Sequence, residues 1–162
     1  MLANILLSVL VLLAADPSTQ PAGGATDKAA IRPVIDDFLK SPAKDDRAKK
    51  IMKFAEDSEN VLISLDRMVV SWMRHDPKYE QADTLLAVFV AGNVRSQLDS
   101  GKAADDSYAG LQEVFRVYRD MQSKQADLKI PEIDSLIEKD KAGTLKPFIA
   151  ERAAANGKAS GK

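Results

Sequence analysis

The spacing of large apolar residues constrains this fold more than any other feature of the sequence. Between residues 28 and 152 such residues recur every three or four positions in almost every segment. An α-helix has 3.6 residues per turn, so this spacing gathers them on one helix face. The connections between segments are short, which makes neighbouring helices antiparallel hairpins. We therefore predict an all-α fold, an irregular bundle of about seven amphipathic helices.

Helix ends are predicted from capping residues, glycine and proline. Pro33 fits only the first turn of a helix, so the first helix should begin near Ala30. Asp76-Pro77 is a typical helix start, because Asp caps and Pro suits the first helical position. Residues 61–63 have an alternative as a short extended segment. The predicted helices span residues 29–40, 45–57, 61–74, 77–98, 107–124, 131–143 and 144–152.

The N-terminus carries an uncharged apolar run at residues 5–15, broken only by Ser8. This run is shorter than the ~18–20 residues of a spanning helix, and it ends in small residues. It predicts a signal-like helix that directs export to the periplasm or the exterior. If it is not removed, residues 2–15 anchor the chain in a membrane. The organisation is then a signal peptide or anchor (1–15), a disordered linker (16–27), a helical domain (28–152) and a disordered tail (153–162).

Charge and composition exclude several classes of function. The chain has 23 basic and 24 acidic residues, a net charge of −1, which argues against nucleic-acid binding. It also argues against a polybasic membrane module, so we expect membrane contact only through the N-terminal segment. The chain has no cysteine, which excludes disulfides and zinc–thiolate sites. We expect no cofactor.

Few residues offer catalytic chemistry. His75 is the only histidine, and its position at a turn favours an exposed residue over a member of a catalytic triad. The acidic pairs at residues 45–46 and 105–106 stand where helix capping alone would place them. Alternating charges on residues 107–124, among them Glu113 and Arg116, indicate a solvated face with i,i+3 ion pairs. No phosphate-binding glycine loop or nucleophile motif occurs.

One segment departs from ordinary helix composition. Gly92 and Asn93 lie in the interior of a predicted helix, where glycine costs about 1 kcal/mol relative to alanine. Close helix packing at Gly92, with Asn93 bonded to the backbone of a neighbouring loop, is one interpretation. In the other, Asn93 and Arg95 line a groove for a ligand or partner, with Tyr108 of the following helix as a third contact.

These observations favour a binding protein over an enzyme. We expect an exported, non-catalytic helical domain that acts by binding another protein or a small ligand, as an interaction or adaptor component of a cell envelope. The alternative is an enzyme, or an enzyme subunit, with a carboxylate and arginine site of no recognisable motif. A helical groove for a lipid or peptide is a third interpretation.

Overall fold

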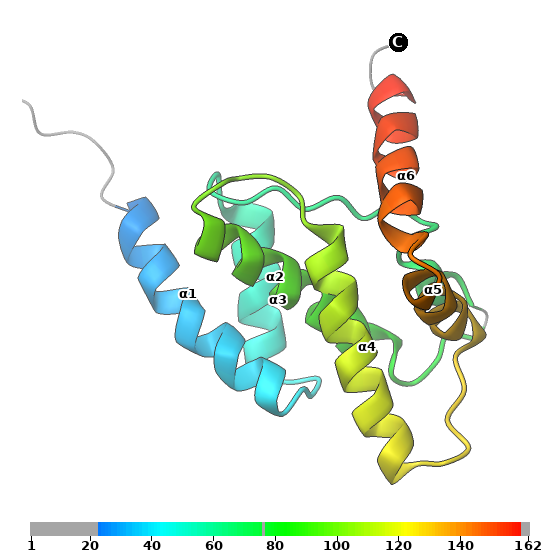
Figure 1. The fold of residues 1–162 in the computed structure, drawn as a ribbon. Coiled ribbons are helices and arrows are strands. Elements are labelled where there is room, and N and C mark those ends of the chain that lie inside the picture. Colours follow the sequence, from blue (N-terminus) through cyan, green and yellow to red (C-terminus); the bar gives the residue numbers. More distant parts are fainter. Residues whose placement is uncertain (1–22, 76, 160–162) are drawn as a thin grey trace, which may run out of the picture.

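The computed structural model describes residues 23–75 and 77–159 and confirms the all-α class (Figure 1). Within these residues there is no strand. The described chain forms six α-helices and one short 3₁₀ helix: α1 (Gly23–Lys40), α2 (Asp46–Asp57), η1 (Ser71–Arg74), α3 (Ala82–Ser100), α4 (Ser107–Lys124), α5 (Pro131–Lys141) and α6 (Leu145–Ala159). None of the described helices combines the length and apolar character needed to cross a bilayer. The predicted signal segment and most of the predicted linker lie outside the described residues.

Helix α3 is the centre of the bundle. It packs against α1, α2, η1 and α4, while α5 and α6 extend the domain beyond α4 (Figure 1). Its inward residues include Leu85, Phe89 and Val94, none of which is exposed. The indole of Trp72 from η1 meets the Phe89 ring edge-on, with ring centroids 6.5 Å apart. A helix covered on several sides needs apolar residues around most of its circumference, and this explains the wide apolar stripe in its sequence.

Helices α3 and α4 approach each other closely at two glycines. A Cβ atom on Gly92 would lie 2.9 Å from Cγ of Glu113 and 3.1 Å from the carbonyl oxygen of Ala109. On the facing helix, a Cβ on Gly110 would lie only 2.7 Å from the carbonyl oxygen of Phe89. The packing reason inferred for Gly92 therefore applies even more strongly to Gly110.

The helix predicted for residues 61–74 is wrong. Residues 61–66 have no regular secondary structure, and only η1 is helical, as a 3₁₀ turn. Side chains distant in sequence bond the backbone of this segment: Gln97 bonds the N–H and the C=O of Leu62 (2.8 and 2.7 Å), and Asp105 accepts from the N–H of Ser64 (2.8 Å). Periodicity within the segment cannot predict such long-range hydrogen bonds.

Asp66 ends this irregular segment and ties it to α6. Its buried carboxylate accepts from the N–H of Met68 (2.8 Å) and binds the guanidinium of Arg152 (3.1 Å) and the amide of Asn156 (2.8 Å). Burial by itself raises the pKa of Asp66, but these hydrogen bonds outweigh it and lower the pKa to about 2. The carboxylate therefore stabilises the fold as a charged group.

Three helix boundaries also differ from the prediction. Helix α3 begins at Ala82 instead of Pro77, after a stretch in which Lys78 pairs with Asp83 of its first turn. Helix α1 begins at Gly23, within the predicted linker, so Pro33 lies inside the helix with its ring exposed to solvent. Helix α6 continues to Ala159, through most of the predicted tail. The predicted α4 and the start of α5 at Pro131 are confirmed, and Asp106 caps α4 at the N–H of Ala109 (3.0 Å).

Candidate functional site

Asn93 lies in a buried polar network between α3 and the connection that follows it. Its side chain is fully buried. The amide donates to Asp105 (2.8 Å), and its oxygen accepts from the backbone N–H of Asp106 (2.9 Å) and from Gln97 (2.7 Å). All these partners belong to the protein, so Asn93 links the α3–α4 connection to α3 and, through Gln97, to the irregular segment at residue 62.

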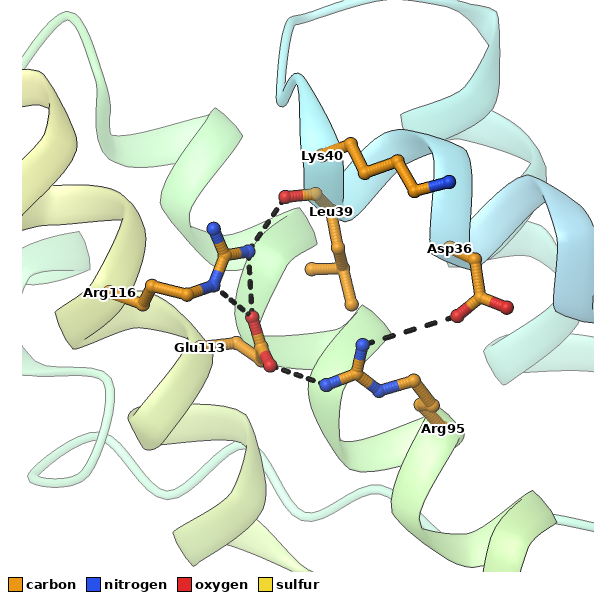
Figure 2. A pocket seen from close by; sticks show the side chains of 6 residues that line it. All are labelled: Asp36, Leu39, Lys40, Arg95, Glu113 and Arg116. Atoms are coloured by element: carbon orange, nitrogen blue, oxygen red, sulfur yellow. Dashed lines mark hydrogen bonds and ion pairs between the residues drawn. The ribbon is translucent and has the colours of Figure 1, made fainter.

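Arg95, two residues from Asn93 and about half a helical turn around α3, lines a pocket. The pocket has a volume of about 340 Å³ and lies at the surface where α1, α3 and α4 meet (Figure 2). We call it the arginine pocket. Its lining comprises Asp36, Leu39 and Lys40 from α1, Arg95 from α3, and Glu113 and Arg116 from α4.

Glu113 is the centre of the arginine pocket and the least exposed of its charged groups, at 14%. One of its carboxylate oxygens accepts from Arg95, and the other accepts from Nε of Arg116 at 2.8 Å (Figure 2). Arg116 also donates to the backbone oxygen of Leu39 (2.6 Å) and so joins α4 to the end of α1. These contacts fix both guanidinium groups in place.

Several cationic donors of the pocket are left over after these contacts. Nη1 of Arg95 is 4.0 Å from Asp36, beyond hydrogen-bond distance. Among the described residues, neither Nη1 of Arg116 nor the ammonium of Lys40 has a hydrogen-bond partner. The pocket holds three cationic side chains against two carboxylates, which leaves a net positive charge with free N–H donors.

Tyr108 stands apart from the arginine pocket. Its ring lies beneath the ammonium of Lys146 from α6, 4.4 Å from the ring centroid. Burial, and then the nearby Asp140 carboxylate, raise the pKa of its hydroxyl. Of the three residues predicted to bind, the structure therefore brings only Arg95 into this pocket, while Asn93 and Tyr108 occupy separate sites.

The other residues of the arginine pocket were not predicted from the sequence to lie together. Glu113 and Arg116 do form the i,i+3 pair expected of the charge alternation on α4, at 2.8 Å. That alternation carried no sign that Glu113 would turn toward α3. Asp36 and Lys40 occupy the polar side of α1, and nothing local indicates which helix they face.

His75 is exposed at a turn, as its position predicts. It stacks on Tyr79 with ring centroids 4.1 Å apart. Its Nδ1 is 3.9 Å from Glu132, which accepts from the Tyr79 hydroxyl at 3.0 Å.

In the described part of the chain, no three His, Asp or Glu residues are grouped as metal ligands. No known family model, curated protein or solved structure matches the chain. Its function is therefore inferred from the charges and geometry of the arginine pocket.

Proposed function

We propose that this chain is an exported, non-catalytic helical domain that binds a protein or a small-molecule ligand. We further propose that the arginine pocket receives an acidic group of that partner. The observation that carries the proposal is the set of unused donors on Arg95, Arg116 and Lys40 around one recess. The N-terminal apolar run supports export.

A carboxylate is the ligand group that this arrangement fits best. A guanidinium presents N–H donors in a planar fork that matches two carboxylate oxygens, and an ammonium adds a third donor. Glu113 already holds both guanidinium groups in fixed orientation, so little side-chain freedom remains to be lost on binding. The apolar side of the pocket is Leu39, which suits an acidic group on a short hydrocarbon stem.

The alternative of an enzyme with a carboxylate and arginine site draws on the same residues. Glu113 is its natural acid–base group, but both oxygens of Glu113 already accept hydrogen bonds from arginine. Such a carboxylate is positioned to hold its neighbours in place, and this favours ligand binding over proton transfer.

The test is a titration of the ¹⁵N-labelled full chain with N-acetyl-glutamate, followed by backbone amide NMR shifts. We expect saturable shifts at amides around Lys40, Arg95 and Arg116, with weak affinity because the probe is small. Inorganic phosphate is titrated in parallel to show whether the site prefers a carboxylate. If neither anion produces saturable shifts, the arginine pocket does not bind an acidic group.

Two charge-neutralising variants make the titration specific. Lys40→Gln removes a cation that has no partner among the described residues, so it should weaken binding about fivefold to tenfold and leave the melting temperature unchanged. Arg119→Gln is the matched control, because Arg119 is exposed on α4 and outside the pocket. Equal weakening by both variants would indicate a general charge effect instead of a site.

Export is tested separately by cell fractionation and intact-mass measurement of the native protein. We expect a mature chain that begins near Asp16 and lies outside the cytoplasm. A full-length chain in the membrane fraction would instead identify residues 2–15 as an anchor, and a full-length chain in the cytosol would refute export.

A further inference from the structure

Exposed large apolar side chains are concentrated in one short segment. Among the described residues, the large hydrophobic side chains that are exposed are Leu62 (58%), Leu65 (48%) and Met68 (41%). All three fall between the end of α2 and η1, in the stretch where the predicted helix is absent. We call residues 62–68 the apolar loop. Their concentration in one loop makes that loop the candidate contact surface of the described domain.

The apolar loop is held in place by the domain. Gln97 hydrogen-bonds both the N–H and the C=O of Leu62, and Asp105 accepts from the N–H of Ser64. Asp66, within the loop, is buried and binds Arg152. Its apolar side chains are therefore presented by a fixed backbone, and a surface that binds them need not order the loop first.

Residues 61–74 carry two exposed charges, both positive, and the nearest exposed acid before them is Glu59. Arg67 lies between Leu65 and Met68, and Arg74 lies beside the loop, with its Nη1 3.4 Å from the sulfur of Met68. The one acid of residues 61–74 is Asp66, which is buried and paired. Apolar side chains interleaved with exposed cations match a bilayer surface that contains anionic lipid, where each cation near the surface adds attraction.

The apolar loop is held near the C-terminal end of α3, where Gln97 bonds Leu62. Arg32, at the middle of α1, pairs with Asp99, two residues after the Gln97 that holds the loop. Helix α1 then continues back along the chain from Arg32 to Gly23, nine residues or about 14 Å further.

We propose that the apolar loop docks on an anionic lipid bilayer, with the side chains of Leu62, Leu65 and Met68 in the interfacial region and Arg67 and Arg74 against lipid phosphates. No residue of the apolar loop lines the arginine pocket. This interaction goes beyond the expected contact through the N-terminal segment alone, because the folded domain itself provides it.

The experiment uses the absence of cysteine from the chain. A single cysteine is introduced in the full-length protein as Leu65→Cys and labelled with an environment-sensitive fluorophore. The control is Ala126→Cys, an exposed position just beyond the end of α4. Ala126 is about 27 Å, the length of α4, from the end where Asp105 holds the loop. Both proteins are reconstituted into vesicles of phosphatidylcholine with and without phosphatidylglycerol.

We expect the label at residue 65 to shift its emission to the blue, and to be quenched by brominated acyl chains, in vesicles that contain phosphatidylglycerol. The label at residue 126 should do neither. Arg67→Glu should remove most of the shift at residue 65 and leave the circular dichroism spectrum unchanged, since Arg67 is exposed and has no partner among the described residues.

Other outcomes would overturn the proposal. If the protein co-floats with vesicles but the label at residue 65 stays in water, the N-terminal segment alone holds the chain at the membrane. If both labels respond equally, the protein adsorbs without orientation. If the shift at residue 65 is the same without phosphatidylglycerol and survives Arg67→Glu, the assigned role of the cations is wrong. The titration of the arginine pocket is unaffected by any of these results.

Discussion

The contact between α3 and α4 gives the sharpest test of how this domain is held together. The change is Gly110→Ala, one added methyl group at the point of closest approach. Its Cβ would lie 2.7 Å from the carbonyl oxygen of Phe89 and 2.8 Å from the Phe89 ring. Real Cβ atoms do not come this close to a backbone oxygen, so the two helices must separate. Phe89 is fully buried.

The expected magnitude is a balance of two terms. Alanine improves helix propensity over glycine by about 1 kcal/mol. Overpacking a closed core costs about 1–3 kcal/mol, and a clash with backbone on one side belongs at the upper end of that range. The variant should therefore lose about 2 kcal/mol of unfolding free energy despite its better helix propensity. For a domain of this size the melting temperature should fall by about 6–8 °C.

Urea unfolding followed by circular dichroism measures this loss, and Gly92→Ala is the matched control. There the new Cβ would lie 2.9 Å from Cγ of Glu113 and 3.1 Å from the carbonyl oxygen of Ala109, so its contact with backbone is less close than at Gly110. We expect Gly92→Ala to stay within about 1 kcal/mol of the parent chain. If Gly110→Ala proves as stable as the parent, or more stable than Gly92→Ala, the close approach of α3 and α4 is refuted.

Two further predictions concern buried polar groups. The pKa of Asp66 is lowered from 3.8 to about 2, so its contribution of about 2 kcal/mol is complete above pH 4 and is lost as the pH falls toward 2. Acid unfolding should show this slope, and Asp66→Asn, less stable at pH 7, should lack it; an unchanged slope would contradict the ion pair with Arg152. Asn93→Ala should cost about 2–4 kcal/mol in urea unfolding, because it leaves the partly buried N–H of Asp106 and one N–H of the Gln97 amide without an acceptor. An unchanged melting temperature would instead favour a role of Asn93 in ligand binding.

Some helices of this domain are determined by residues within or beside them, whereas residues 61–74 take their conformation with contacts from distant parts of the chain. Helix α4 and the start of α5 were predictable because their signals are local: Asp106 caps α4, Pro131 is the first residue of α5, and each helix carries its own apolar stripe. Residues 61–74 have an equally regular stripe, yet they fold as a loop and a 3₁₀ turn. The groups that decide this, Gln97, Asp105 and Arg152, stand tens of residues further along the chain.

The candidate site also has a part that the sequence predicted and a part that depends on the tertiary structure. Arg95 was identified from the sequence as a polar residue in an unusual helical segment. Its partners Glu113 and Arg116 were assigned to a solvated face, since charge alternation is the same whether such a face meets water or another helix. The unused donors of the arginine pocket depend on distances between α1, α3 and α4, and no pattern within one helix contains that information.

The sequence by itself determined the all-α class, most of the helices and the presence of a glycine contact, because helix formation and capping act over three or four residues. Only the tertiary structure decided that Gly110 is the tighter of the two glycines and that Asn93 is enclosed. It alone gathered charges from three helices into one pocket and left Leu62, Leu65 and Met68 exposed. The physical reason is that burial, close packing and ion pairing depend on which helix faces meet. The pairing of faces is a property of the whole core, because each helix must bury its stripe against what the others leave open.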